Sequence, residues 1–469
     1  MRIVHSQGLV VIGGGLAGSE AAWQAAERGL QVKLWEMRGG GGQTGAHRTT
    51  DLAELVCSNS LGSRLQDRAS GVLMAEMRQM GSLLLGLAEQ VAVPAGGALA
   101  VDREAFARRV SEHVGNHPRI QVVRREAKKL PEGLAVVASG PLTSAALSKD
   151  LQRLTGEEHL FFYDALSPIV EAESIDMQIA FRGSRYGRGQ TKEGDYINLP
   201  FGQQAYDQFV DALVSAERVP LRAFESEIAH GVQAGMGRYF EGCLPVEVIA
   251  ARGRMALAFG PMRPVGLVDP RTGERPYAVV QLRQDNLAGN LYNLVGFQTN
   301  LTYQAQRRVL KMIPGLQEAT FVRYGQMHRN TFLNAPCVLR PTLQHRTNPQ
   351  LLFCGQLTGV EGYLGSMATG LLAGVNAFRV AKGAAPLVLP QTTMLGALCH
   401  YIAHADAGSF QPMKANFGIL APLTDGVRRN RRQRAKAYAE RSKTDLASAW
   451  RSGGEKIAHS HIDSSNDDT

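Results

Sequence analysis

The sequence has few cysteines and no long uninterrupted apolar run. Its cysteines are scattered and include no CxxC pair, which is typical of a reducing compartment rather than of a disulfide-stapled domain. The longest apolar region, residues 82–101, is broken by Glu89, Gln90 and Pro94, so it cannot supply the roughly 20 apolar residues of a membrane-spanning helix. The first residues show no basic segment followed by an apolar core and a cleavage site. We therefore expect a cytoplasmic protein that does not cross a membrane.

The composition is otherwise that of a globular protein with a positive charge excess. The chain has 469 residues, of which 44% are hydrophobic and 20% charged, and its formal net charge is +9; this length has room for roughly two to four domains. Residues 428–443 hold eight Lys or Arg and a single Glu. We expect a basic helix over 428–450, serving either as a solvated face or as a phosphate-binding surface, and a disordered tail over 451–469.

A dinucleotide-binding pattern opens the chain. An apolar run at 9–12 is followed by Gly-x-Gly-x-x-Gly, an Ala-rich helical segment and a second strand that ends on Glu36. In such a turn the first glycine permits the tight bend, the second lets backbone amides approach a pyrophosphate, and the third lets the helix pack closely. Glu36 is placed to accept hydrogen bonds from a ribose. The cofactor-binding candidates here are Gly13, Gly14, Gly15, Leu16, Ala17, Gly18 and Glu36.

A second glycine-rich strand-to-helix junction lies at residues 351–374. In large flavoproteins a late segment of this kind returns the chain to the first domain and aims a helix N-terminus at the flavin ring, so Gly355 and Gln356 are further cofactor candidates and FAD is favoured over NAD as the tightly held cofactor. The predicted fold is α/β: a discontinuous Rossmann-like FAD-binding domain with an inserted α/β domain. We expect the FAD-binding domain to comprise 1–150 and 335–427, and the insertion to comprise 151–334.

Two cysteines stand in unusual sequence surroundings. Cys57 lies in ELVCSNS and Cys243 in YFEGCLPVE; from local sequence alone, a buried and inert thiol is the default interpretation of each. The segments around them, together with LYNLVGFQTNLTYQAQRRV, GQLTGVEGY and FQPMKANFGIL, resemble the folate- and FAD-dependent tRNA (uracil-5-)-methyltransferase family, TrmFO. This resemblance covers nearly the whole chain and ends near Arg434.

The resemblance implies a complete activity. The family methylates uridine 54 of the tRNA T loop to 5-methyluridine, taking carbon from 5,10-methylenetetrahydrofolate and electrons from NADH or NADPH through FAD. By motif, Cys243 resembles the cysteine that attacks uracil C6, Cys57 the second catalytic cysteine, and Tyr363 a tyrosine near the flavin ring. Uracil C5 is a poor nucleophile until a group adds at C6, and a thiolate suits that addition. The implied partners are tRNA and folate.

Other interpretations stay open from the sequence. The related wobble-uridine carboxymethylaminomethyl-modifying flavoproteins of the MnmG type share the GQ-x-x-G-x-x-GY signature, and a flavin-bound tRNA-binding protein without turnover is a third possibility. His400 and His404 stand four residues apart, but no Glu occupies the HExxH position, so we expect no metal site. The sequence does not decide between NADH and NADPH, and it leaves the oligomeric state open.

Overall fold

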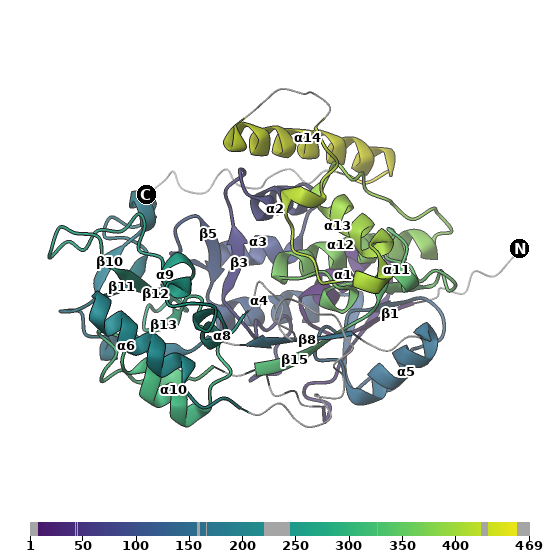
Figure 1. Ribbon diagram of the computed structural model, residues 1–469. Coiled ribbons are helices and arrows are strands. Elements are labelled where there is room, and N and C mark those ends of the chain that lie inside the picture. Colours follow the sequence, from purple (N-terminus) through teal and green to yellow (C-terminus); the bar gives the residue numbers. More distant parts are fainter. Residues whose placement is uncertain are drawn as a thin grey trace, which may run out of the picture.

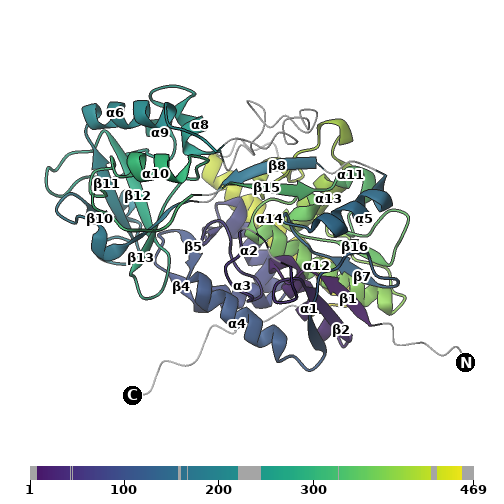
Figure 2. The same ribbon diagram turned by 90° about the horizontal axis from the view of Figure 1, so that it is seen from below.

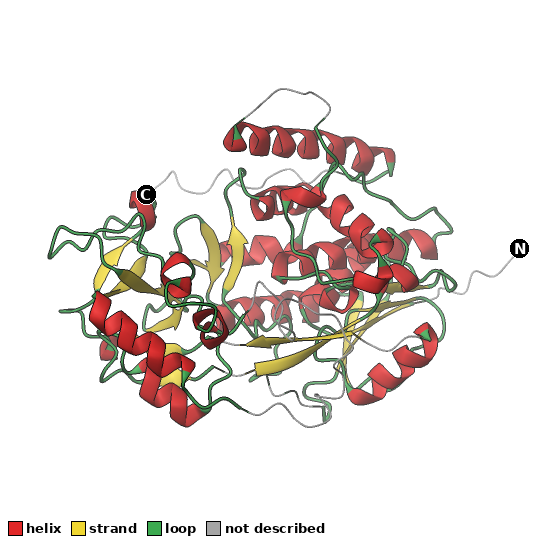
Figure 3. Cartoon of the chain, viewed as in Figure 1, coloured by secondary structure: helices red, strands yellow, loops and turns green. Residues whose placement is uncertain are grey.

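The computed structural model describes residues 8–42, 44, 46–156, 160–165, 167–219, 244–325, 327–423 and 430–456. The chain forms two units, with the inserted unit at the left of Figure 1 and the larger unit at the right. In Figure 3 helices surround the strands of the larger unit, whereas strands form the centre of the inserted unit. Each unit has its own buried hydrophobic core.

A five-stranded parallel sheet organises the larger unit. Its spatial order is β16-β7-β1-β2-β6, and every neighbouring pair is parallel. The three strands β1, β7 and β16 are almost fully buried and rich in Val, Leu and Ile, as expected of a sheet covered on both faces, whereas β2 and the edge strand β6 are partly exposed. Their bounds are β1 Leu9–Ile12, β2 Val32–Glu36, β6 Ile120–Arg124, β7 Ala135–Val137 and β16 Leu351–Phe353. The last of these strands in the sequence, β16, enters the sheet after the inserted unit has been completed.

Two long helices pack closely because small residues line their contact. These are α1 (Leu16–Glu27) and α12 (Tyr363–Ala381). A Cβ added at Gly370 would lie 2.2 Å from the Ala17 carbonyl oxygen, and one at Gly374 would lie 2.4 Å from that of Ala21. Since no side chain fits these gaps, the small residues of the late segment are what allow it to return to the first helix. The late segment therefore lies directly against the first helix, as expected of a chain that returns to the first domain.

The inserted unit is built on a six-stranded antiparallel sheet of order β10-β11-β12-β13-β9-β14. The strands are β9 Ile169–Glu171, β10 Phe181–Gly183, β11 Tyr196–Phe201, β12 Ala278–Gln284, β13 Leu291–Leu294 and β14 Phe321–Arg323. Its helices are α6 Gln203–Val214, α8 Val246–Ala250, α9 Ala256–Phe259 and α10 Tyr303–Leu310. An antiparallel ribbon of β8 (Leu160–Ala165) and β15 (Met327–Phe332) carries the chain into and out of the insertion and lies between the two units (Figures 1 and 2).

The remaining elements complete the larger unit. A small sheet of order β3-β5-β4 joins β3 Ser60–Ser63, β4 Ala92–Val93 and β5 Ala98–Val101. The helices are α2 Ala69–Gln79, α3 Leu83–Gln90, α4 Arg103–Gly115, α5 Ala145–Thr155, α11 Ala335–Val338, α13 Met394–His404 and α14 Arg431–Ser452. Side-chain caps fix several helix starts, such as Asp102 on the amide of Ala105 in α4 and Ser144 on that of Leu147 in α5.

The predicted fold class is confirmed: strands from both ends of the sequence share one parallel sheet, and an α/β unit is inserted between them. The domain boundaries stay a prediction, although the boundary at residue 150 falls inside α5, whose Leu147 and Leu151 belong to the core of the larger unit. Among the described helices, none is long and apolar enough to cross a membrane.

The basic C-terminal segment falls on α14, which lies along the outside of the larger unit over α2 (Figure 1). Two side chains of α14, Leu446 and Trp450, are fully buried. A capping box of Asn430 and Gln433 fixes the start of the helix. For residues 451–456 the structure differs from the predicted disorder, because Glu455 pairs with Arg28 at 2.8 Å. Residues 457–469 lie outside the described residues.

A two-part cavity as the candidate active site

The glycine turn between β1 and α1 forms a cradle at the C-terminal edge of the parallel sheet. Gly13 has φ +98°, a conformation that favours glycine, and a Cβ there would lie 2.5 Å from the Ala138 carbonyl oxygen. A Cβ at Gly18 would lie 1.8 Å from the Gly13 carbonyl oxygen, whereas one at Gly15 would meet nothing within 4 Å. Gly13 and Gly18 therefore serve the turn and the packing, and Gly15 leaves space beside the start of α1.

The start of α1 suits a negatively charged group. Gly15 is the N-cap residue and provides no side-chain cap for the first amides of the helix. Uncapped amides together with the positive end of the helix dipole form an anion site. The arrangement fits the pyrophosphate of a dinucleotide.

Glu36 is held rigidly at the end of β2. One carboxylate oxygen accepts from the Gly14 amide at 2.7 Å, and the other accepts from the amide and the Nε of Arg38, both at 2.9 Å. Burial alone would raise the pKa of Glu36, but the hydrogen bonds and charge of Arg38 and the Gly14 amide outweigh it, so the pKa is lowered. Glu36 is therefore ionised at neutral pH, with lone pairs left to accept from a ribose.

These groups line a first pocket of about 980 Å³. Of the predicted cofactor residues, the pocket is lined by Gly13, Gly15, Leu16, Ala17, Glu36, Gly355, Gln356 and Tyr363. Gly14 and Gly18 do not line the pocket. The Gly14 amide binds Glu36, and Gly18 packs against the backbone of Gly13. The structure thus brings the early glycine loop and the late 355–363 segment to one cavity.

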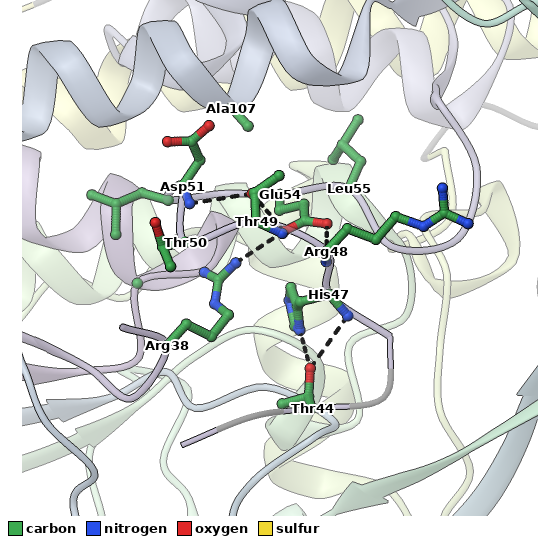
Figure 4. Close-up of polar contacts among 12 residues, drawn as sticks. Arg38, Thr44, His47, Arg48, Thr49, Thr50, Asp51, Glu54, Leu55 and Ala107 are labelled. Carbon is green, nitrogen blue, oxygen red and sulfur yellow. Dashed lines mark hydrogen bonds and ion pairs between the residues drawn. The ribbon is translucent and has the colours of Figure 1, made fainter. Parts of the chain in front are cut away.

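Arg38 joins the cradle to the loop that precedes Cys57. Its Nη1 lies 3.3 Å from a carboxylate oxygen of Glu54, and Figure 4 shows this side chain reaching toward Glu54. Glu54 also accepts from the amides of Arg48 and Thr49, at 2.8 and 3.0 Å. The carboxylate therefore holds the turn before the ELVCSNS motif against the first pocket.

A second pocket of about 1420 Å³ adjoins the first. The two share five lining residues: Val56, Pro141, Leu142, Gln356 and Tyr363. Cys57 lines the second pocket and is partly exposed, and its amide donates to the Tyr363 hydroxyl at 2.7 Å. Because Tyr363 begins α12 and borders both spaces, the dinucleotide cradle and the Cys57 thiol lie in adjoining pockets.

The other cysteines differ from Cys57. Cys354 and Cys399 are buried, and burial raises the pKa of both thiols, that of Cys399 to about 12; neither forms a reactive thiolate at neutral pH. Cys337 is exposed on α11. Cys243 lies outside the described residues, so its predicted role stays a prediction.

His400 and His404 stack on one another, with ring centroids 5.5 Å apart. Within the described ranges, no group of three or more His, Cys, Asp or Glu side chains could hold a metal ion.

Several cavity residues were not found from the sequence. Arg125 lies over the Trp35 ring at 3.8 Å, and both line the first pocket. Residues 138–144, after β7, form another wall. Gln298, which comes from the inserted unit, and Lys414 line the second pocket. The position of 138–144 directly after a parallel strand next to β1 could have indicated them, because the C-terminal ends of such strands line ligand crevices. Gln298 and Lys414 lie in segments that carry the family resemblance, but nothing in those segments indicates which residue faces the cavity.

Comparison with known proteins identifies relatives over most of the chain. The family described as "Glucose inhibited division protein A" matches residues 8–385. The methylenetetrahydrofolate–tRNA-(uracil-5-)-methyltransferase TrmFO of Anoxybacillus flavithermus is 54% identical over 434 residues, covering 92% of this chain and 97% of that protein. The protein of the same name from Bacillus cytotoxicus is 54% identical over 437 residues, covering 93% and 97%.

Among solved structures, Aquifex aeolicus GidA in its form II crystal superposes with a TM-score of 0.64 at 14% sequence identity, covering 96% of this chain and 76% of that chain. At this identity the likeness concerns the fold alone. The sequence identity to the uracil-5-methyltransferases extends over nearly the full length of those proteins. The chain belongs to the TrmFO family.

Proposed function

We propose that the protein methylates C5 of uridine 54 in the tRNA T loop, forming 5-methyluridine. The carbon comes from 5,10-methylenetetrahydrofolate, and the electrons come from NADH or NADPH through FAD. The observation that carries this proposal is the pair of adjoining pockets, in which a dinucleotide cradle and a partly exposed thiol meet at Tyr363. The names of the 54% identical relatives favour this activity over wobble-uridine modification and over tRNA binding without turnover.

The first pocket would hold FAD in an extended form. The amides beside Gly15 would bind the pyrophosphate and Glu36 would accept from the adenosine ribose. The start of α12 at Tyr363 then borders the far end of the pocket, where the positive helix end would stabilise negative charge on the ring system. Bound there, FAD supplies the two electrons that convert a methylene group into a methyl group.

The second pocket has room for the other reactants. Its volume of about 1420 Å³, which includes space open to solvent, exceeds that of the first pocket, and we assign this space to a flipped pyrimidine and a folate. Cys57 borders this space, and we assign it to proton removal from C5 or to assistance in methylene transfer. The Tyr363 hydroxyl fixes the backbone of Cys57 by accepting from its amide.

Cys243 is the proposed nucleophile at uracil C6, an assignment that rests on its motif. One hydrogen bond in the described chain supports this assignment. The amide of Val246, three residues after Cys243, donates to the Gln298 carbonyl at 2.7 Å. Gln298 lines the second pocket. The end of the YFEGCLPVE motif therefore lies beside the space in which the uracil would bind.

Electrostatics support a polyanionic partner. The net charge of +9 and the exposed Arg432, Arg434 and Lys436 of α14 favour a tRNA backbone. These three cations would act by attraction at the outer surface and not in the chemistry.

The test is product formation on a defined transcript. Purified protein is incubated with unmodified tRNA, NADPH and methylenetetrahydrofolate carrying isotopic carbon in its methylene group, and the nucleosides are then analysed. We expect labelled 5-methyluridine at position 54, its loss in Cys57→Ala, and its retention in Cys337→Ala, which removes an exposed thiol on α11. A modified wobble uridine, or tRNA binding without labelled product, would contradict the proposal.

A further inference from the structure

Three arginines from separate elements bind the short segment that carries Cys57. Arg103, at the start of α4, donates to the carbonyls of Leu55 and Cys57 at 3.3 and 3.2 Å. Arg283 on β12 donates to the Ser58 hydroxyl at 2.9 Å. Arg323 on β14 donates to the Val56 carbonyl at 2.9 Å. Two of the three come from the inserted unit, so this unit holds the thiol-bearing segment of the larger one.

Two of these guanidinium groups have further partners. Arg103 forms an ion pair with Asp285 at 3.0 Å. Arg283 also binds the side-chain oxygens of Asn59 and Asn293, at 2.9 and 3.3 Å. Arg283 is buried and Arg103 is nearly so, and both are bound on several sides, which identifies them as parts of the interface between the units.

Arg323 has fewer partners than Arg103 and Arg283. In the part of the chain that the structure describes, no carboxylate lies within 4.0 Å of its guanidinium, and the Val56 carbonyl is its hydrogen-bond acceptor. Burial lowers the pKa of Arg323 to about 10, with repulsion from Arg103 and Arg48 adding to the effect. The group is still cationic at neutral pH, and among the described residues it is a half-buried positive charge without a matching carboxylate.

The thiol of Cys57 is the group whose ionisation these arginines would favour. Arg103, Arg283 and Arg323 each interact electrostatically with it. The other ionisable groups facing this region are Asp285, paired with Arg103, and Tyr363, which interacts with Arg103 and Arg323. Glu361 and Lys414 line the same pocket and lie 4.0 Å from one another. Arg103 is paired with Asp285, and Arg283 interacts electrostatically with the same carboxylate. Arg323 is bound to the residue before Cys57 and, within the described chain, has no carboxylate within 4.0 Å.

We propose that Arg323 is a positioning residue for Cys57: it fixes the Val56 carbonyl and supplies the positive charge that keeps the neighbouring thiol in its thiolate form. The proposal deepens the proposed function and rests on it for the use made of Cys57. It gives the inserted unit a direct part in activating the thiol. A nearby opposite charge favours the charged form of a thiol, and the thiolate is the reactive species.

The test measures Cys57 alone and needs neither tRNA nor folate. The flavin-loaded protein is alkylated with iodoacetamide over a range of pH, and modification of the Cys57 peptide is followed by mass spectrometry. For Arg323→Gln we expect the profile to move to higher pH and the rate at pH 7 to fall roughly tenfold, the effect of losing one nearby opposite charge. Arg323→Lys retains the charge and should recover most of the rate. Arg308→Gln, which removes an exposed arginine of α10, should leave the profile unchanged.

Two results would overturn the proposal. One is an Arg323→Gln protein with normal flavin content and an unchanged Cys57 profile. The other needs no variant. If alkylation of wild-type Cys57 has the same pH dependence as that of a free cysteine, its thiolate is not stabilised by the protein. If the wild type makes no 5-methyluridine yet shows the Arg323-dependent profile, the proposed function fails and this inference stands.

Discussion

The two halves of the cavity are built in different ways. The first pocket is formed by backbone geometry at the ends of parallel strands, where glycines prevent clashes as short as 1.8 Å. The second is formed by side chains of residues distant in sequence, such as Cys57, Gln298 and Lys414. Cofactor binding therefore depends on a local glycine turn, whereas the chemistry depends on contacts between the inserted unit and the larger one.

The largest effect we predict concerns the chemistry alone. Cys243→Ala should abolish formation of 5-methyluridine while the protein keeps its flavin, because an alanine cannot add to uracil C6. Product analysis and the flavin absorbance check the two halves separately. Full activity in this variant would remove Cys243 from the mechanism, and loss of flavin would tie it to the first pocket.

Two glycine variants separate the cofactor from the fold. Gly15→Val should fold but bind flavin at least roughly 100-fold more weakly, because its side chain enters the space that the pyrophosphate needs. Gly18→Val should destabilise the protein by more than about 3 kcal/mol, because its Cβ would overlap the Gly13 carbonyl. Flavin titration and thermal unfolding measure the two effects. Equal behaviour of the two variants would contradict the division of roles.

The first pocket could be predicted from the sequence better than the second, because it is built from local turns and not from contacts between distant residues. The turn at Gly13, the acid at Glu36 and the return at Gly355 could be predicted because each is coded by neighbouring residues. The partners of the Cys57 segment could not: Arg283 lies on β12 and Arg323 on β14, and nothing in their local sequence indicates contact with residues more than 200 positions earlier. The roles of Cys57 and Tyr363 came from family resemblance, and the structure adds the hydrogen bond that joins them.

A smaller effect tests the residue common to both pockets. Tyr363→Phe removes the acceptor of the Cys57 amide. We expect turnover to fall about tenfold with little loss of flavin, since an unpaired donor costs about 1–3 kcal/mol in positioning. Single-turnover kinetics would resolve this effect. A fall in flavin affinity with unchanged turnover would place Tyr363 in the first pocket alone.

The smallest effect lies outside both pockets, on α14. Arg432→Gln combined with Arg434→Gln should lower tRNA affinity a few-fold and reduce the slope of its salt dependence by about 0.7–0.9 for each phosphate that the helix no longer neutralises. Substitution suits this helix better than truncation. Truncation would also remove the buried side chains of Trp450 and Leu446 and expose the core surface that they cover. Arg108→Gln with Arg109→Gln, on α4, is the charge-matched control. Equal salt slopes for the two pairs would make α14 a solvated face.

If the two adjoining pockets bring the flavin and the Cys57 thiol together, an experimental structure of the FAD-loaded protein will show it. We expect electron density for the adenosine beside Glu36 and for the isoalloxazine beside Tyr363 and Gln356, with the ring facing the second pocket and Cys57. A ring bound away from Tyr363, with the Cys57 sulfur closed off from it, would rule this arrangement out.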